Sequence, residues 1–105
     1  METKFKNSSG KIIGRIKGDI FEKTVKKNHL FKKYNAWGID KTVVDSLVKE
    51  KIPRIVIHDR EEKIDYETSV KEFFEKGIEG DFGHGEQIFL SLENFEKKEA
   101  KRKKK

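Results

Sequence analysis

The sequence predicts a small single domain of the α+β class, with a mainly antiparallel sheet and two or three short helices. At 105 residues the chain fits one domain and leaves little room for a second core. Only 33% of the residues are hydrophobic and 42% are charged, but eight Phe, two Tyr and one Trp provide enough apolar area for a core. Segments with the two-residue period of strands alternate with segments of helical period.

The chain divides into three parts by composition. We expect a flexible N-terminus over residues 1–10, a single α+β domain over residues 11–95, and a basic tail over residues 96–105 that is disordered or a frayed helix. The tail contains no apolar residue larger than Ala100, so nothing in its sequence anchors it to a core.

The first elements of the domain are a hairpin and a short helix. Residues 11–25 hold two β-rich segments on either side of Gly18, which tolerates the positive φ of a tight turn. A helical spacing of i, i+1, i+4 and i+7 follows and ends at Gly38; its members are Leu30, Phe31, Tyr34 and Trp37.

A longer helix is predicted from Lys41 to about Lys51. Asp40 is a good N-cap, and Ile39 and Val44 have the spacing of a hydrophobic staple. Pro53 disfavours helical geometry in the residue before it, so the helix ends there.

The next segments predict a second hairpin and a second helix. A β-branched run over residues 54–58, a polar turn over 59–63 and a strand over 64–68 form the hairpin. Ser69 and Glu72 match a capping box. The helix that they begin buries Val70, Phe73 and Phe74 and closes at Gly77.

The last part of the domain contains a glycine-rich loop and one strand. The loop spans residues 80–85, the strand spans residues 87–92, and a terminal helix begins at Glu93. The loop follows a helix and enters a strand, the reverse of the order in phosphate-binding loops, so a structural loop is favoured over a ligand site at His84.

Charge is distributed unevenly along the chain. Residues 1–34 carry ten Lys/Arg and three Asp/Glu (+7), residues 35–95 carry eight and fourteen (−6), and residues 96–105 carry seven and two (+5), which sum to the net +6. Two basic ends around an acidic middle are typical of a chain whose basic parts meet a polyanion.

The leading functional hypothesis is therefore a non-enzymatic protein that binds nucleic acid, or associates with it, through phosphate contacts that depend little on sequence. A Lys-rich solubilising surface is the competing interpretation. Phe31, Tyr34 and Trp37 could stack on bases, although their spacing more often indicates core packing. The candidate nucleic-acid-binding residues are Lys23, Lys26, Lys27, Lys32, Lys33, Tyr34, Lys101, Arg102 and Lys103.

Two alternatives belong to other functional classes. The acidic middle segment could dock on a basic protein, as an interaction or inhibitor module. Six side chains are candidate ligands for the metal ion of a metal-dependent phosphoryl hydrolase. Most of them would equally be expected on the solvent-exposed face of a hairpin, where they need no catalytic role. These candidates are His58, Asp59, Asp65, Glu67, Asp81 and His84.

Several classes are not supported by the sequence. Cysteine is absent, so disulfides and thiolate metal sites are excluded, and the three scattered His residues predict neither a metal site nor a cofactor. Neither a signal peptide nor a membrane span is visible, so we expect a cytoplasmic protein without a membrane partner. The motifs are not those of helix-turn-helix, RNA-recognition or KH modules.

Overall fold

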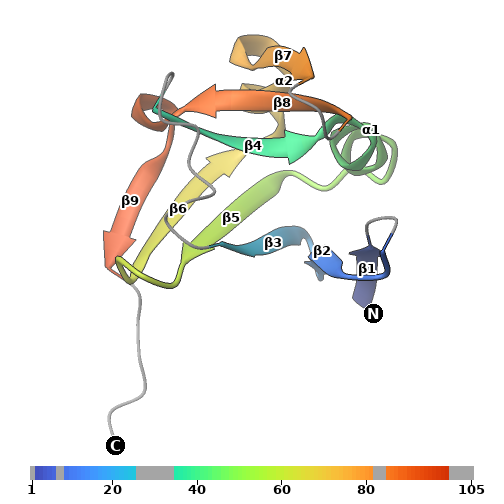
Figure 1. Cartoon of the computed structure of the whole chain (residues 1–105), viewed down its shortest axis with the longest axis horizontal. Coiled ribbons are helices and arrows are strands. Elements are labelled where there is room, and N and C mark those ends of the chain that lie inside the picture. Colours follow the sequence, from blue (N-terminus) through green and yellow to red (C-terminus); the bar gives the residue numbers. More distant parts are fainter. Residues whose placement is uncertain (1, 7–8, 26–34, 82–84, 100–105) are drawn as a thin grey trace, which may run out of the picture.

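The computed structural model describes residues 2–6, 9–25, 35–81 and 85–99, which form two β-sheets and two α-helices (Figure 1). The larger sheet has six strands in the order β1-β2-β3-β5-β6-β9, and the smaller has three in the order β4-β8-β7. The strands are β1 (Glu2–Lys6), β2 (Ile12–Lys17), β3 (Ile20–Val25), β4 (Ala36–Asp40), β5 (Arg54–Asp59), β6 (Ile64–Ser69), β7 (Ile78–Asp81), β8 (Glu86–Ser91) and β9 (Glu96–Glu99). The helices are α1 (Lys41–Lys49) and α2 (Val70–Lys76).

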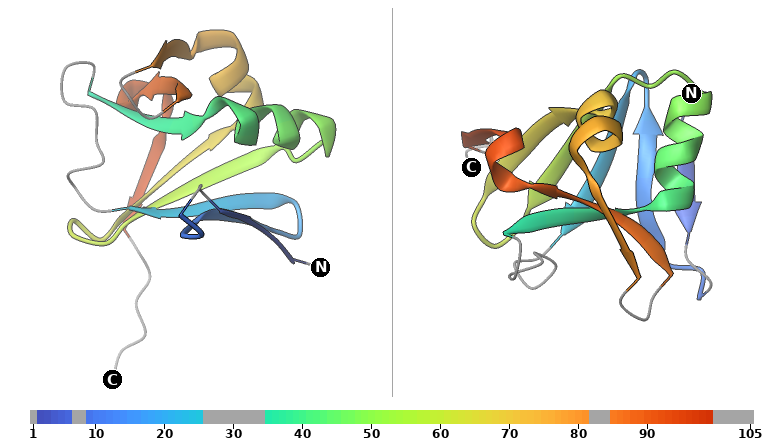
Figure 2. Two further views of the ribbon diagram at one scale, coloured as in Figure 1. Left: turned by 45° about the vertical axis from the view of Figure 1, so that its right-hand side comes forward. Right: turned by 90° about the horizontal axis from the view of Figure 1, so that it is seen from above.

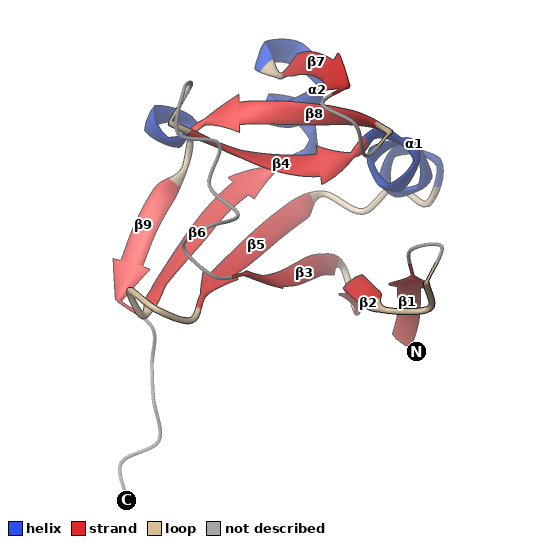
Figure 3. Ribbon diagram, in the orientation of Figure 1, coloured by secondary structure: helices blue, strands red, loops and turns tan. Residues whose placement is uncertain are grey.

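This arrangement confirms a small α+β domain whose sheets are mostly antiparallel. Strands dominate the ribbon in Figure 3, and the smaller sheet lies across the larger one with α1 at one end (Figure 2). The exception to antiparallel pairing is β3 with β5, which run parallel. Parallel neighbours need a long crossover, and the chain makes it by way of β4 and α1.

The hairpin predicted around Gly18 is confirmed, since β2 pairs with β3 and Gly18 has φ of 66°. Residues 2–6, expected to be flexible, instead form β1 at the edge of the sheet. Phe5 explains the difference, because its ring lies 5.9 Å from that of Phe21. Gly14 leaves the room for this packing: a Cβ there would stand 2.3 Å from the Phe21 ring.

Trp37 lies in a strand, so the helix predicted to end at Gly38 is wrong for this part of the segment. β4 pairs with β8, which places Trp37 opposite Leu90 and Ile39 opposite Ile88. The two-residue period then turns Trp37 and Ile39 into the core, where Trp37 is only 2% exposed. The rest of the predicted helix, residues 30–34, lies outside the described residues.

Helix α1 begins and ends close to the predicted positions. Asp40 occupies the N-cap position but makes no capping hydrogen bond with its side chain. Instead, its Oδ1 accepts a hydrogen bond of 3.0 Å from Gln87 Nε2 on β8. The helical period predicts an apolar stripe of Val43, Val44, Leu47 and Val48; the first three are buried, whereas Val48 is 44% exposed.

Helix α2 confirms the capping box, since the backbone N–H of Glu72 donates a 3.1 Å hydrogen bond to Ser69 Oγ. The prediction that both phenylalanines are buried is wrong. Phe73 is 1% exposed, whereas Phe74 is 64% exposed. Consecutive helical residues point about 100° apart, and the helix face that buries Val70 and Phe73 leaves Phe74 toward solvent.

The end of the domain contains more strand than predicted. Gly80, assigned to a loop, lies in β7, which pairs with β8. The helix expected from Glu93 is replaced by a single 3₁₀ turn, Leu92–Asn94, and then by β9. Residues 96–99, expected to begin the tail, therefore pair with β6.

The core lies between the two sheets and the helices. Its largest buried side chains are Trp37, Phe21 and Phe73. The Tyr66 ring lies 5.5 Å from that of Trp37 and 6.0 Å from that of Phe95, so aromatic contacts join β4, β6 and the residue that precedes β9. No helix in the described part of the chain is long and apolar enough to cross a membrane.

Candidate nucleic-acid interface

The larger sheet has one face toward the core and one face outward. Ile16, Phe21 and Ile57 point into the core, and their neighbours along each strand point the other way. The smaller sheet and the helices lie on the inner side (Figure 1). Among the described elements, none covers the outer face.

Four cations gather on this outer face at the β1–β2 end. On β1, Lys4 and Lys6 flank the inward Phe5, and on β2, Arg15 and Lys17 flank the buried Ile16. The pairing places Lys4 opposite Arg15. We call the exposed set Lys4, Lys6, Arg15 and Lys17 the basic face.

The basic face is only partly neutralised by the chain itself. Arg15 Nη1 donates a 2.9 Å hydrogen bond to Glu2 Oε2, and this bond lowers the pKa of Glu2. Among the described residues, no ion pair joins Lys4, Lys6 or Lys17 to a carboxylate. None of the three has an ion-pair partner among the described residues, but the carboxylate of Glu2, which stands opposite Lys17 on the same face, offsets part of the charge of Lys4 and Lys17.

The opposite end of the same face is balanced in charge. Glu67 lies between Arg54 and Lys98 and forms an ion pair with each, at 2.6 Å from Lys98 Nζ. These bonds lower the pKa of Glu67, with the Lys98 hydrogen bond contributing most. His58 Nδ1 lies 2.9 Å from Asp65 Oδ1 on the neighbouring strand. The β5–β6–β9 end thus satisfies its own charges.

The candidate metal ligands are not gathered into a site. Asp59 is buried and its Oδ1 accepts hydrogen bonds from the backbone N–H groups of Glu61 and Glu62, which closes the β5–β6 turn. Asp65 and Glu67 do share one face of β6, as predicted, but both take part in the ion pairs described above. In residues 2–6, 9–25, 35–81 and 85–99, no three His, Asp or Glu side chains are placed to hold a metal ion. His84 lies outside those residues.

Lys23 does not join the outward cations. It lies between Phe21 and Val25 on β3 and points inward with them. Its Nζ donates a 3.3 Å hydrogen bond to the carbonyl oxygen of Gly38 on β4. Burial lowers the pKa of Lys23, and the nearby charge of Asp40 opposes that shift only in part. The prediction of Lys23 as a surface contact for phosphate therefore does not fit its position.

The remaining predicted contacts lie outside the described residues: Lys26, Lys27, Lys32, Lys33, Tyr34, Lys101, Arg102 and Lys103. The basic face was not predicted, although the sequence contains a signal for it. Lys4 and Lys6 alternate around one apolar residue, and so do Arg15 and Lys17, which is the pattern of cations on the wet face of a strand.

The acidic middle segment is divided among separate elements. Glu79 on β7 and Glu86 on β8 lie 3.5 and 3.9 Å from Lys41 Nζ, and the acidic residues of α2 pair with lysines on the same helix. Six of the fourteen acidic side chains of residues 35–95 thus form ion pairs within the domain, and they lie on β6, α2, β7 and β8.

Comparison of the chain with protein-family models, with curated proteins and with solved structures found no match.

Proposed function

We propose that this protein binds nucleic acid without catalysis, by contacts between the basic face and the phosphate backbone. The observation that carries the proposal is the alignment of Lys4, Lys6, Arg15 and Lys17 on one uncovered sheet face, with Glu2 as the ion-pair partner of Arg15. Lysine and arginine that neutralise phosphates release counterions, and this release drives binding that is independent of sequence.

The spacing of the cations supports contact with a regular phosphate array. Residues two apart on a strand are separated by about 7 Å, and adjacent strands by about 4.8 Å. Each strand of a duplex presents one phosphate per about 3.4 Å of helix axis. Flexible Lys and Arg side chains at these separations reach neighbouring phosphates of one strand without bending the backbone of the sheet.

The chemistry of the face favours phosphate contact over base recognition. Among the described residues, no aromatic side chain is exposed on the basic face, since Phe5 packs against Phe21 and Trp37 is buried. Binding to single strands without sequence preference generally uses exposed aromatic rings as stacking platforms. The basic face therefore suits a charge-dependent contact with duplex backbone, to which the cations at residues 26–33 and 101–103 would add.

The test is the salt dependence of duplex DNA binding, measured by fluorescence anisotropy. Four phosphate contacts give a slope of about −3.6 in log K against log salt, so a fourfold rise in salt weakens binding about 150-fold. The variant Lys4→Gln/Lys6→Gln/Arg15→Gln/Lys17→Gln should bind more weakly at low salt and show a shallower slope.

A matched variant separates location from net charge. Lys49→Gln/Lys63→Gln/Lys76→Gln/Lys97→Gln removes the same formal charge from exposed lysines outside the basic face. If both quadruple variants lose the same affinity, net charge alone attracts the DNA and the proposal is wrong. Magnesium-dependent cleavage of the DNA during the titration would favour the hydrolase alternative instead.

A further inference from the structure

One carboxylate lies among the cations of the basic face and is bonded to one of them. Glu2 begins β1 and stands directly opposite Lys17 on β2. Its Oε2, however, accepts the 2.9 Å hydrogen bond from Nη1 of Arg15, two residues before Lys17. A bond between guanidinium and carboxylate is charge-assisted, and a phosphate oxygen would make the same kind of bond. Glu2 therefore occupies a position that suits a phosphate.

The cations around Glu2 hold its carboxylate in the charged form. The hydrogen bond from Arg15 is the main cause of the lowered pKa of Glu2, and the charges of Arg15, Lys4 and Lys17 lower it further. The Arg15 side chain is 47% exposed and the Glu2 side chain 37%, so solvent reaches the pair. An exposed ion pair shifts an equilibrium by a factor of about five or less. A ligand that offers several phosphates can therefore displace the Glu2 carboxylate.

A second carboxylate near Arg15 is not bonded to it. Glu22 on β3 stands directly opposite Arg15 on β2 and lies on the same outer face. Within the part of the chain that the structure describes, no ion pair joins these two side chains. Arg15 thus has a carboxylate on each neighbouring strand and is paired with the one on β1. Glu22 is therefore a matched control for Glu2.

We propose that Glu2 is an internal competitor of phosphate for Arg15, which nucleic acid must displace before it can contact the whole basic face. This role rests on the proposed function. The sheet holds Glu2 beside Arg15, so Glu2 competes at a high effective concentration, and a single phosphate only exchanges one anion for another. A phosphate backbone that also contacts Lys4 and Lys17 gains further contacts at the same time. Glu2 therefore makes the basic face favour a chain of phosphates over an isolated phosphate.

Duplex DNA binding at low salt, measured by fluorescence anisotropy, tests the competition. Any removal of negative charge from the outer face raises the affinity for DNA, and Glu22→Gln measures that general gain. Glu2→Gln should bind about threefold to fivefold more tightly than Glu22→Gln does, because Arg15 is then free of its internal partner.

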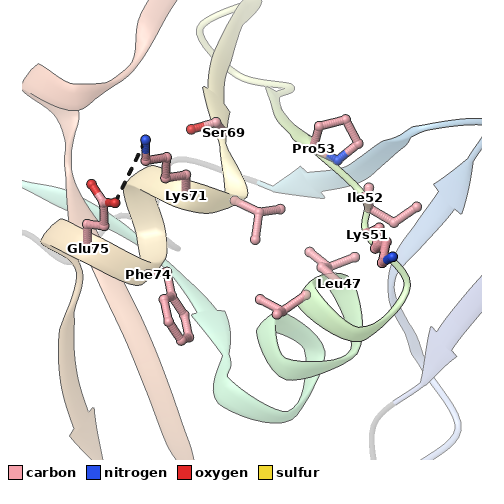
Figure 4. Close-up of a pocket in the computed structure, with 10 residues that line it drawn as sticks. Leu47, Lys51, Ile52, Pro53, Ser69, Lys71, Phe74 and Glu75 are labelled. Carbon is pink, nitrogen blue, oxygen red and sulfur yellow. Dashed lines mark ion pairs between the residues drawn. The ribbon is translucent and has the colours of Figure 1, made fainter.

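Glu75 provides a control for a paired carboxylate outside the basic face. Figure 4 shows its ion pair with Lys71 on α2, and the distance from Nζ to Oε2 is 4.0 Å. Glu75→Gln breaks this pair and removes the same charge as Glu2→Gln, yet it should raise DNA affinity no more than Glu22→Gln. The pair lies beside the α1–α2 groove, an apolar hollow of about 460 Å³ whose lining includes Leu47, Val48, Ile52, Pro53, Val70 and Phe74.

A double-mutant cycle shows whether Glu2 acts through Arg15. In an Arg15→Gln background, Glu2→Gln should gain no more affinity than Glu22→Gln, since no guanidinium is left to release. If Glu2→Gln gains no more than its two controls, or keeps its extra gain without Arg15, this role of Glu2 is wrong while the proposed function stands. A parent without salt-dependent DNA binding contradicts the proposed function, and the role of Glu2 falls with it. Thermal melting shows whether each variant is folded.

Inorganic phosphate tests the preference for a chain of phosphates without any DNA. Added at constant ionic strength, it should shift the amide NMR signal of Arg15 in Glu2→Gln and leave that signal nearly unchanged in the parent. Equal responses of the two proteins, including no response in either, would overturn the competition between Glu2 and phosphate.

Discussion

The ammonium of Lys23 and the carbonyl oxygen of Gly38 are joined by a 3.3 Å hydrogen bond that links the larger sheet to the smaller one. Lys23 belongs to β3 in the six-stranded sheet, and Gly38 belongs to β4, an edge strand of the three-stranded sheet. Lys23, which was predicted to be a surface residue, is thus part of the contact between the two sheets.

This position predicts a pH effect on stability. Burial lowers the pKa of folded Lys23 below the ordinary 10.5, so the unfolded chain holds the proton more tightly. Below both pKa values the burial of the charge opposes folding, and the penalty disappears as pH rises through the folded pKa toward 10.5. The parent should therefore gain stability relative to Lys23→Met over that rise, as measured by urea unfolding. If the difference in unfolding free energy between the parent and Lys23→Met stays constant with pH, the burial of the charged Lys23 side chain is contradicted.

Lys23 should also contribute little to binding of nucleic acid. Its Nζ is directed between the sheets, so Lys23→Gln should leave the slope of DNA affinity against salt unchanged. The same anisotropy titration measures this slope. A loss equal to that of Lys17→Gln, a single change on the basic face, would show that Lys23 reaches the phosphates.

The two phenylalanines of α2 should differ sharply in stability. Phe73 is fully buried and its ring lies 5.8 Å from that of Phe95, so Phe73→Ala should lower the free energy of unfolding by about 3–5 kcal/mol. Phe74 is mostly exposed, so Phe74→Ala should change it by about 0.5 kcal/mol or less in dilute protein. Urea unfolding measures both, and equal losses would contradict the orientation of α2.

The sequence correctly predicted those turns and helix ends whose geometry is set by residues close together in the chain. The Ser69–Glu72 cap and the Gly18 turn are set within a few residues, and both are confirmed. The choice between Phe73 and Phe74 depends on which ring meets Phe95, more than twenty positions away, and the helical period alone permits either.

Long-range pairing explains what the sequence did not predict. β9 contains only Glu and Lys, so no apolar pattern marks it as a strand; its pairing with β6 and the Glu67–Lys98 ion pair place it in the sheet. Trp37 fits a helical spacing equally well, and only its pairing with Leu90 shows the strand. The basic face likewise required β1, which the composition had assigned to a flexible N-terminus.

The Glu67 ion pairs predict a loss of stability in acid. Hydrogen bonds from Lys98 and Arg54 hold the pKa of folded Glu67 below its ordinary 4.5. The stabilisation is present above 4.5 and is lost as pH falls through the folded pKa. The advantage of the parent over Glu67→Gln in urea unfolding should therefore shrink with acidification.

Glu93→Gln is the matched control for this acid effect, because Glu93 is exposed and forms no ion pair among the described residues. At neutral pH, Glu93→Gln should lower the free energy of unfolding by less than Glu67→Gln does. If the free energies of unfolding of the two variants depend on pH in the same way, the Arg54–Glu67–Lys98 cluster contributes nothing to the stability of the fold.

The most direct test of the proposed function is an amide NMR titration of the full chain with a short mixed-sequence DNA duplex at low salt. We predict that, within the described residues, the largest chemical-shift changes occur on β1 and β2, at Lys4, Lys6, Arg15 and Lys17, and that they reverse when salt is added. The α1–α2 groove should change little. Shifts confined to residues outside the basic face, or no shifts at any DNA concentration, would contradict the account.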